Sequence, residues 1–390
     1  METPLDPQTP ARIPVTPDDS SRDPRRARLL VAGGGTGGHV LAGVAVAEAW
    51  RRAHGGEAEV LFVGARGGIE EKLVPRAGFP LELLDLGALN RVSMTRRVQT
   101  LFQLPFTLLR SWSLVRKFRP RAVLGVGGYA SGPVVLVARL LSRLGLNQAR
   151  TAILEQNTVA GMTNRILGRF VDLVFSAFPG TEASFPGRTV RVTGNPVRSA
   201  IGRMPAPLAN PFTIFIFGGS QGALGINSLV LEALPHLGAV MPRLRFIHQT
   251  GERDHVRVVQ GYADADVKAR VEKFIHDMSP AYAEASLVIC RAGSSTLSEI
   301  AAVGRPAVLI PFPHAADNHQ ETNARVFVDA GAAMLVLQGR ATGEDLAGLI
   351  IKCVAEPARL AEVSAKATTF HRPDAAGDIA RGLEFSDMRG

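Results

Sequence analysis

The chain has 390 residues, a formal net charge of +9 at pH 7 and 46% hydrophobic residues. Its length exceeds that of a typical single domain, so we expect two domains, each large enough to bury its own core. No apolar run reaches the ~18 residues that a membrane-spanning helix needs, which argues against such a helix. The two cysteines, Cys290 and Cys353, lie within apolar runs and lack the spacing of a metal site or a disulfide, so we expect buried, reduced thiols.

Residues 1–27 are polar and rich in proline, and they lack the apolar stretch of a signal peptide. A segment of this composition buries too little apolar surface to become ordered. We therefore expect a disordered tail in the cytoplasm.

The excess of positive charge favours an anionic partner, which would be nucleic acid, an acidic membrane surface or a phosphorylated substrate. Basic residues concentrate between residues 90 and 121, where they bracket an apolar middle. The apolar side chains of this middle include Leu101, Phe102, Phe106, Leu109 and Trp112. The pattern is typical of a helix in a membrane interface, with its cations at anionic headgroups, although a core-facing helix with a solvated basic face would also fit. Nucleic acid is not expected, because no helix-turn-helix or zinc-finger signature occurs and the basic stretch is strongly apolar.

Short β-rich runs alternate with helical stretches along the chain, which is typical of βαβ units and parallel sheets. The first set of strands is expected at residues 28–32, 59–64, 81–87, 121–128, 151–157, 172–178 and 189–196. A linker with three prolines is expected at 197–211. The second set is expected at residues 212–223, 243–251, 271–277, 286–293, 306–313 and 332–337.

These two sets predict two Rossmann-like α/β domains, at residues 28–196 and 212–370. A C-terminal helix within residues 371–390 is expected to pack back on the first domain. Both sets begin with a buried strand, a glycine-rich turn and a helix start. If the parallel sheets face each other across a central cleft, their strand-end loops surround one ligand site, because open parallel sheets bind ligands at the carboxyl ends of their strands.

The first glycine-rich turn, GGGTGG at residues 33–38, satisfies the pattern G-x-G-x-x-G. A dinucleotide is nevertheless not expected, because the next strand ends without the acid that would bind the ribose. The lysine of a P-loop is also absent, so nucleoside triphosphate hydrolysis is not expected. What remains is a set of backbone N–H groups at a helix start, suited to a diphosphate within a larger ligand. A tight turn without a ligand is the alternative.

His39 directly follows this turn, where an imidazole can act near neutral pH. General base, phosphate ligand and structural residue are three open interpretations of His39. The loops GVGGYASGP at residues 125–133 and EQN at residues 155–157 follow other strands of the same sheet and can converge on one polar face. Within them, Glu155 and Asn157 can orient an acceptor hydroxyl or the ring of His39.

In the second half, Ser220 and the backbone of Gln221 lie at another helix start, again suited to a diphosphate. Glu299, about two turns into the helix after RAGSS, can take both hydroxyls of a ribose, although a solvated helix face is the alternative. His319 and Gln320 lie in a polar loop that suits a sugar. No metal is expected, because the DAD triplet at residues 264–266 falls in a helical run and the histidines lack ligand spacing.

The motifs GGGTGGHVLAG, GGYASGP, EQN, TGNPVR, GGSQGA, RAGSSTLSE and DNHQ occur in this order. In combination they resemble the bacterial MurG family, UDP-N-acetylglucosamine (UDP-GlcNAc) transferases that turn lipid I into lipid II in peptidoglycan synthesis. The resemblance runs from about residue 28 to near the C-terminus. It implies a GT-B fold that binds lipid I through the N-terminal domain and UDP-GlcNAc through the C-terminal domain, without a cofactor. It also implies a peripheral position on the cytoplasmic face of the membrane, and cell-wall assembly proteins as partners.

The resemblance also implies site residues. On the acceptor side these are Gly35, Thr36, His39, Gly128, Tyr129 and Ser131. On the donor side they are Thr36, Gly37, Gly38, Asn157, Arg198, Ser220, Gln221, Asn227, Ile275, Glu299, His319 and Gln320. Catalysis would involve His39, Glu155 and Asn157.

Individual donor roles follow from the same resemblance. Arg198, Ser220 and Asn227 would serve the diphosphate and nearby groups, and the backbone of Ile275 would face the uracil. Glu299 would hold the ribose, and His319 with Gln320 would face GlcNAc. Two positions depart from the family: its first motif usually reads H-V-F-P-G, where this chain has HVLAG, and its usual paired glutamines are His319-Gln320 here.

The expected reaction is a single inverting displacement, in which the C4 hydroxyl of MurNAc attacks C1 of GlcNAc and UDP leaves. His39 is the first choice for the base and Glu155 the second. The enzyme alternatives are a UDP-GlcNAc 2-epimerase and a GT-B transferase acting on another lipid. A non-catalytic nucleotide-sugar or polyanion binding protein is the alternative from another class.

Overall fold

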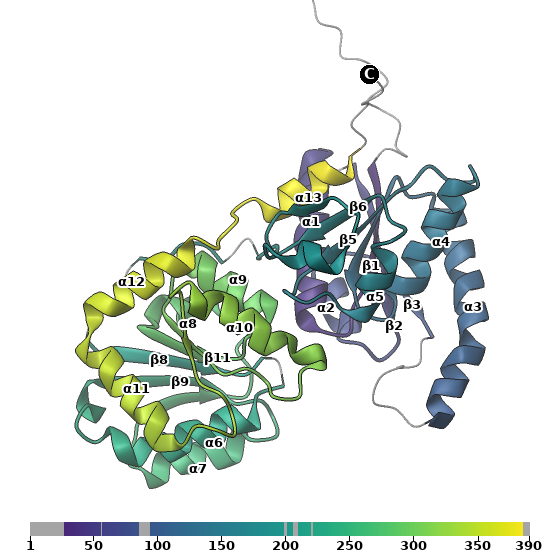
Figure 1. Ribbon diagram of the computed structural model, residues 1–390. Coiled ribbons are helices and arrows are strands. Elements are labelled where there is room, and N and C mark those ends of the chain that lie inside the picture. Colours follow the sequence, from purple (N-terminus) through teal and green to yellow (C-terminus); the bar gives the residue numbers. More distant parts are fainter. Residues whose placement is uncertain are drawn as a thin grey trace, which may run out of the picture.

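The structure is a computed structural model that describes residues 27–55, 57–85, 94–198, 201–205, 210–219 and 221–384, without the side chains of 94–102. Two α/β domains lie side by side, each built on a parallel sheet with helices on both faces (Figure 1). This confirms the expected fold class. The predicted tail, apart from Ala27, lies outside the described residues, as do Ser220 and parts of the predicted linker.

The first domain contains β1 (Arg28–Gly33), β2 (Glu59–Ala65), β3 (Leu81–Leu84), β4 (Ala122–Gly127), β5 (Arg150–Glu155), β6 (Leu173–Ser176) and β7 (Val190–Val192). They form one parallel sheet in the order β3-β2-β1-β4-β5-β6-β7. The central strands are almost continuously apolar and buried, because helices cover both faces of a parallel sheet. Strand order reverses between β1 and β4, which is where sheets of this kind bind ligands.

The helices of the first domain are α1 (Gly37–Ala53), α2 (Glu70–Arg76), α3 (Met94–Phe118), α4 (Ser131–Arg143) and α5 (Met162–Leu167), with a 3-10 turn at Thr181–Ser184. The apolar side of α1, which includes the fully buried Trp50, packs on one face of the sheet. Val115 of α3 and Val134 of α4 pack on the other face. The sheet is therefore covered by α1 on one side and by α3 and α4 on the other.

The second domain contains β8 (Phe212–Phe217), β9 (Leu244–Gln249), β10 (Ala269–Glu272), β11 (Leu287–Cys290), β12 (Ala307–Leu309) and β13 (Met334–Leu335). The parallel order is β10-β9-β8-β11-β12-β13, so the reversal lies between β8 and β11. The strand expected at 271–277 is shorter and earlier than predicted. It ends at Glu272 because the N–H of Ile275 leaves the sheet to bond the side chain of Gln249.

The helices of the second domain are α6 (Leu224–Ala233), α7 (His255–Asp264), α8 (Ser279–Glu284), α9 (Ser294–Val303), α10 (His319–Asp329), α11 (Gly343–Ala355) and α12 (Pro357–Thr368). Short 3-10 turns lie at Leu234–Leu237, Met241–Arg243 and Ala316–Asn318. Buried side chains of α6, α7 and α11 cover one face of the sheet, and those of α8, α9 and α10 cover the other.

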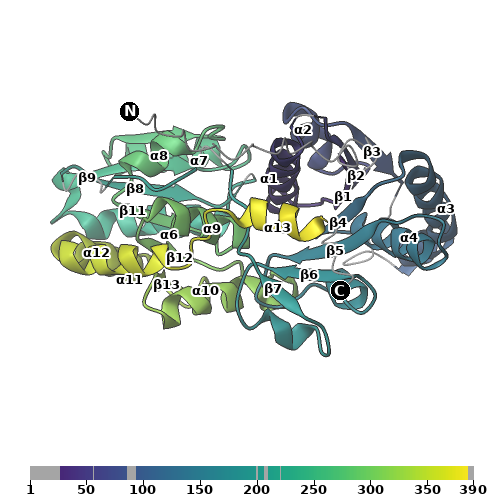
Figure 2. The same cartoon turned by 90° about the horizontal axis from the view of Figure 1, so that it is seen from above.

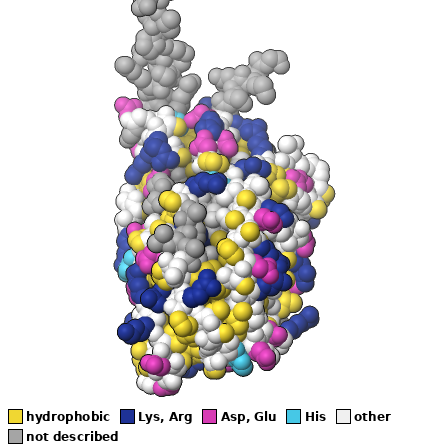
Figure 3. All heavy atoms as spheres, turned by 90° about the vertical axis from the view of Figure 1, so that its left-hand side faces the viewer, with side chains coloured by type: hydrophobic (Ala, Val, Ile, Leu, Met, Phe, Trp, Pro, Cys, Tyr) yellow, Lys and Arg dark blue, Asp and Glu magenta, His cyan; other side chains and the backbone are white. Residues whose placement is uncertain are grey.

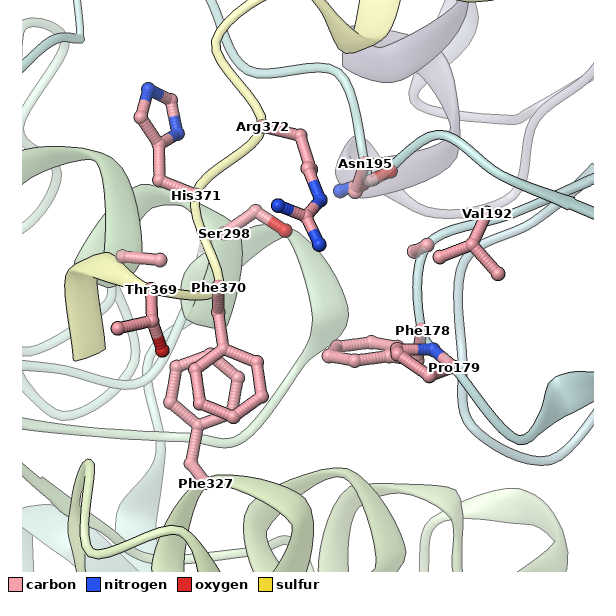
Figure 4. Close-up of a pocket in the computed structure, with 12 residues that line it drawn as sticks. Phe178, Pro179, Val192, Asn195, Ser298, Phe327, Thr369, Phe370, His371 and Arg372 are labelled. Atoms are coloured by element: carbon pink, nitrogen blue, oxygen red, sulfur yellow. The ribbon is translucent and has the colours of Figure 1, made fainter. Parts of the chain in front are cut away.

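The last helix, α13 (Ala375–Leu383), crosses back to the first domain and lies beside α1 (Figure 2). Its Ile379 and Leu383 are fully buried in the same core cluster as Trp50. Near its start, aromatic rings also join the domains: Phe327 stacks on Phe370 with ring centroids 4.3 Å apart and meets Phe178 of the first domain edge-on. These rings line a cavity of about 140 Å³ at this junction (Figure 4).

Candidate active site

The first glycine-rich turn connects β1 to α1 at the reversal point of the sheet. Thr36 caps the helix, and its Oγ1 accepts a hydrogen bond from the N–H of His39 at 3.4 Å. The N–H of Gly35 is already taken, because it donates to Oε2 of Glu70 at 3.0 Å. Gly35 therefore offers no free N–H to a phosphate, contrary to the sequence interpretation. The N–H groups of Gly37 and Gly38 have no partner among the described residues.

Glu70 is a site residue that the sequence analysis missed. It begins α2, yet its side chain is only 1% exposed. Its second carboxylate oxygen accepts the N–H of Ala65 at 2.9 Å, so this one group joins the ends of β1 and β2. A glutamate in the first turn of a helix is ordinarily exposed and interacts favourably with the helix dipole. The position of Glu70 at a helix start therefore does not indicate a buried residue. The glycines around it, at Gly64 and Gly68, are the signal that could have revealed a buried side chain.

His39 is half-buried and lies against the backbone of Gly127, at the end of β4. Its Nδ1 is 3.2 Å from the carbonyl oxygen of Gly34, so Nδ1 carries the proton and donates it. Burial lowers the pKa of His39, and His319 lowers it further, whereas the Gly34 carbonyl and the carboxylates of Glu155 and Glu70 act in the opposite direction. The ring is therefore neutral at pH 7, with the lone pair of Nε2 available to accept a proton.

The loop after β4 packs directly on the first turn. A Cβ on Gly128 would lie 2.4 Å from the oxygen of Gly34, so only glycine fits there. Tyr129 is about one-third exposed. Ser131 does not fit its expected role in acceptor binding, because its side chain is fully buried at the start of α4 beside Gly125.

Glu155, at the end of β5, is 2% exposed and is surrounded by donors. One oxygen accepts the N–H and the side-chain amide of Asn157 at 2.9 and 3.3 Å. The other accepts the N–H of Gly161 at 3.1 Å and the amide of Asn164 at 2.9 Å. Each oxygen already accepts two hydrogen bonds, so the buried carboxylate has no free position at which a ligand hydroxyl could bind. Glu155, the second choice for the base, is therefore instead a residue that holds the EQN loop in its conformation.

Asn157 lies at the interface of the two domains. Its Oδ1 accepts a hydrogen bond from the amide of Asn323 at 3.0 Å. Oδ1 of Asn323 accepts the N–H of Thr158 at 2.9 Å, and the hydroxyl of Thr158 donates to Thr322 at 3.0 Å. Asn323 is fully buried, and the sequence analysis missed it. Its position four residues after His319 places both on one face of α10, which is the signal that could have found it.

Other contacts bring the first turn and the second domain together. A Cβ on Gly38 would meet the hydroxyl of Ser295 at 2.2 Å, so the start of α1 touches the start of α9. Arg165 pairs with Asp317 at 3.5 Å. Nδ1 of His319 donates a hydrogen bond to the carbonyl oxygen of Ala316 at 2.6 Å, so Nδ1 carries the proton.

Arg198 and Glu299 form an ion pair at 3.2 Å, although the sequence analysis gave them separate ligands. The other carboxylate oxygen of Glu299 accepts the hydroxyl of Tyr282 at 3.0 Å. Burial raises the pKa of Glu299, and Arg198 and Tyr282 oppose that shift. Glu299, the residue expected to bind the ribose, and Arg198, a residue expected to bind the diphosphate, are therefore direct neighbours.

The second glycine-rich loop, at residues 218–222, follows β8. The side-chain amide of Gln249 donates to the carbonyl of Gly219 at 2.9 Å, and its oxygen accepts the N–H of Ile275 at 2.8 Å. Gln249 therefore joins the loop to the expected uracil segment and leaves the carbonyl of Ile275 for a ligand. Gln221 is exposed next to it. The sequence analysis missed Gln249, whose signal is a polar residue at the end of a buried strand.

Asn227 cannot contact a diphosphate as expected, because it is 1% exposed inside the second domain. Its amide donates to the Thr250 carbonyl at 3.0 Å and to Asp254 at 2.6 Å, and its oxygen lies 3.0 Å from Nε2 of His248. Burial lowers the pKa of His248 to about 3. Asn227 therefore supports the end of β9 from inside the domain.

The sugar loop contains the start of α10. Gln320 accepts the N–H of Phe312 at 2.9 Å, which leaves its NH₂ group for a sugar hydroxyl. In the part of the chain that the structure describes, no group of three or more His, Cys, Asp or Glu is placed to hold a metal ion.

The predicted membrane segment falls on α3, and α3 and α4 lie on the side of the first domain remote from the second (Figures 1 and 2). Phe106 is 75% and Leu109 is 67% exposed. Trp112 is instead half-buried against the core, and the side chains of Leu101 and Phe102 lie outside the described ones. We define the apolar face by its exposed side chains, which are Leu104, Phe106, Leu109, Leu136, Leu140 and Leu144.

The surroundings of this apolar face are basic, since Arg116, Lys117 and Arg143 are exposed at the ends of the two helices. The face of the molecule shown in Figure 3 differs, because basic, acidic and apolar side chains are interspersed there. No helix among the described residues is long and apolar enough to cross a bilayer.

Two family domains match the chain. Residues 29–176 match the glycosyltransferase family 28 N-terminal domain, and residues 213–379 match the glycosyltransferase family 28 C-terminal domain. The UDP-N-acetylglucosamine–N-acetylmuramyl-(pentapeptide) pyrophosphoryl-undecaprenol N-acetylglucosamine transferase of Anaeromyxobacter sp. (strain Fw109-5) is 48% identical over 356 residues. That match covers 90% of this chain and 92% of the relative.

Solved structures give the same result. MurG of Acinetobacter baumannii superposes with a TM-score of 0.73 at 32% identity, covering 91% of this chain and 98% of that one. A UDP-N-acetylglucosamine 2-epimerase superposes with a TM-score of 0.60 at 12% identity, covering 91% and 95% of the two chains. The epimerase likeness therefore concerns the fold alone.

Proposed function

This chain belongs to glycosyltransferase family 28 and, within it, to the MurG family, and we propose that it transfers GlcNAc from UDP-GlcNAc to lipid I. The acceptor group is the C4 hydroxyl of MurNAc in undecaprenyl-pyrophosphoryl-MurNAc-pentapeptide, and the product is lipid II. Support comes from a relative of this name that matches nearly the whole length of both chains. The chain is therefore a UDP-GlcNAc-dependent N-acetylglucosaminyltransferase.

One observation carries the assignment of the base. His39 donates from Nδ1 to the carbonyl of Gly34, and this leaves the lone pair of Nε2 free at the domain interface. Because burial lowers the pKa of His39 from its ordinary value, the ring is neutral at pH 7 and can accept a proton. Glu155 is a poorer candidate, because four donors hold its carboxylate.

The proposed step is one inverting displacement. Nε2 of His39 takes the proton of the C4 hydroxyl while the hydroxyl oxygen forms a bond to C1 of GlcNAc. The bond between C1 and the β-phosphate oxygen breaks, and UDP leaves with the electron pair. The proton on the imidazolium then passes to solvent, which returns His39 to its starting state.

The second domain would hold the donor. The start of α6 would direct its backbone dipoles at the diphosphate, where negative charge develops as UDP leaves. We propose that ribose hydroxyls take the place of Arg198 on Glu299, which frees the guanidinium for the diphosphate. The NH₂ group of Gln320 and the ring of His319 would contact GlcNAc.

The apolar face on α3 and α4 supports a peripheral position on the cytoplasmic face of the membrane. Its exposed leucines and Phe106 would enter the acyl boundary, and the neighbouring cations would meet anionic headgroups. Vesicles of phosphatidylglycerol and phosphatidylcholine test this by sedimentation. We expect binding to the anionic vesicles, a tenfold or larger loss in Phe106→Ser/Leu109→Ser, and no loss in the control Val256→Ser, whose side chain is 81% exposed on α7. Equal binding of the double variant would contradict the assignment.

The activity itself is tested by UDP release with UDP-GlcNAc and a short-chain lipid I analogue, with and without EDTA. We expect release that depends on the acceptor, yields a disaccharide product and persists in EDTA. UDP-GlcNAc consumption without acceptor would instead indicate an epimerase.

A further inference from the structure

The peptide unit between Gly34 and Gly35 is bonded at both of its ends. Its N–H, on Gly35, donates to Oε2 of Glu70 at 3.0 Å. Its C=O, on Gly34, accepts from Nδ1 of His39 at 3.2 Å. One amide group therefore lies in series between a buried carboxylate and the imidazole.

From this arrangement we propose that Glu70 is a positioning residue for His39, acting through the Gly34–Gly35 peptide. The carboxylate fixes the plane of the peptide and polarises it, which makes the Gly34 carbonyl a stronger acceptor for Nδ1–H. That bond selects the tautomer with a free Nε2 and favours the imidazolium that forms during transfer. The inference rests on the proposed role of His39 as the base.

The surroundings of Glu70 leave its carboxylate no freedom to move away. Its other oxygen is held by the N–H of Ala65, and the side chain is 1% exposed. The Cα atoms of Gly34, Gly64 and Gly68 lie so close that an added Cβ would be 2.1, 2.5 and 2.3 Å from atoms of Glu70. Three glycines thus make room for one carboxylate, and two backbone donors hold it.

The contacts of Glu70 extend beyond those of a residue that only connects β1 to β2. A tie that only joined β1 to β2 would need the N–H groups of Gly35 and Ala65, but not the carbonyl of Gly34. The contact of His39 with that carbonyl, together with the packing of Gly127 on its ring, makes the imidazole the end of the series. Glu70 also contributes an electrostatic effect that raises the pKa of His39.

The test uses Glu70→Gln in the full chain, with Glu71→Gln as the matched control. Glu71 is the next residue of α2 and is exposed, and it accepts the N–H of Gly67 outside the site. We expect Glu70→Gln to lower kcat about 10- to 100-fold, as removal of an outer orienting group does, with little change in the affinity for UDP. The acid limb of the kcat pH profile should move to lower pH, because the imidazolium loses a favourable carboxylate. Glu71→Gln should leave both unchanged.

A second background separates this inference from the proposed function. In His39→Gln, adding Glu70→Gln should cost nothing further, because the residue through which it acts is gone. An equal, additive loss in that background would overturn the inference and make Glu70 a loop anchor alone. If His39→Gln itself keeps the native rate, the proposed base is wrong. If it loses the rate while Glu70→Gln does not, only the inference fails.

A measurement on the native protein keeps the inference testable if Glu70→Gln does not fold. Nitrogen-15 NMR of labelled histidine reports which ring nitrogen carries the proton. We expect the neutral form of His39 to be protonated on Nδ1. A neutral His39 protonated on Nε2 would remove the contact with the Gly34 carbonyl and overturn the inference.

Discussion

The two glycine-rich loops occupy the same place in their sheets, at the reversal of strand order, but different groups hold them. In the first domain a buried carboxylate, Glu70, takes the N–H of Gly35 and the loop ends in an imidazole. In the second domain a neutral amide, Gln249, takes the carbonyl of Gly219. An internal anion suits a loop that presents a base, whereas a loop held by a neutral amide keeps its positive dipoles for the diphosphate of the donor.

The groups packed behind the two glycine-rich loops also differ between the domains. Behind the second loop, His248 lies between Tyr262 and Asn227 at hydrogen-bond distance and is neutral. Behind the first loop, Glu70 is surrounded by glycines rather than by polar side chains. Proton transfer and donor binding are thus assigned to different domains, and the variants below separate them.

Among the variants that keep His39, the largest effect is expected from Gly68→Ala. Its Cβ would lie 2.3 Å from a carboxylate oxygen of Glu70, with no change of backbone conformation required. Displacing the carboxylate should lower kcat about 100-fold and destabilise the first domain by ~1–3 kcal/mol, as overpacking does. Kinetics and thermal unfolding measure both. Gly348→Ala, where the added methyl meets nothing within 4 Å, is the control. An unchanged kcat in Gly68→Ala would show that Glu70 need not stay in place.

Asn227→Ala should act on the second domain. The substitution leaves the carbonyl of Thr250 and the ring of His248 without their partner, which costs about 1–3 kcal/mol of unfolding free energy. The affinity for UDP should change little, because the buried side chain does not reach the ligand and acts only through the end of β9. Urea unfolding and UDP titration decide the matter. A large loss of UDP affinity at native stability would restore Asn227 to the diphosphate site.

The second domain should also lose stability in acid through His248. Its pKa is about 3 in the folded chain and 6.5 in the unfolded chain, so between these values the unfolded state binds more protons. Stability is therefore complete above pH 6.5 and decreases as the pH falls, by about 2 kcal/mol at pH 5. Urea unfolding at pH 7 and pH 5 measures this contribution as the difference between native protein and His248→Gln. Equal pH dependence in the two proteins would show that His248 is not the group responsible.

The smallest effect is expected at the domain interface. Asp317→Asn removes the ion pair with Arg165, whose side chains are about half exposed, so solvent screens most of its energy. We expect a change in kcat/KM of less than about fivefold, with stability unchanged. Asn323→Ala is the comparison and should have the larger effect, because it removes a buried amide that bonds both Asn157 and Thr158. If Asp317→Asn has the larger effect, the surface pair rather than the buried amide holds the domains together.

The sequence predicts the sheets well because buried parallel strands are apolar runs bounded by glycines, as in residues 212–217. It also predicts His39 at a helix start, Asn157 just after a strand, and Glu299 inside the helix that follows β11. What it cannot predict is which polar groups satisfy each other. Glu155 and Asn227 carry the residue types of ligands, yet other groups of the protein already occupy them. The partners of Glu155 lie two to nine residues further along the chain, and those of Asn227 lie 21 to 27 residues away.

The same limit explains the missed residues. Gln249 and Asn323 belong to none of the sequence motifs. Their partners, Gly219 and Asn157, reach them only through the folded sheet and the contact between the two domains. Trp112 was assigned to the membrane because helical spacing alone does not define which side of an apolar helix packs on the sheet. In the structure it packs on the core, while Phe106 and Leu109 face outward.

The most direct test of the division between the two loops is His39→Gln, measured in two ways on one preparation. One measurement is the single-turnover rate at saturating UDP-GlcNAc and lipid I analogue, and the other is the dissociation constant for UDP. We predict a rate lower by about 100- to 10,000-fold, as loss of a general base causes, with UDP affinity within about twofold of native. A rate within about threefold of native, or a loss of UDP affinity as large as the loss of rate, would contradict the assignment of the base to the first loop and the donor to the second.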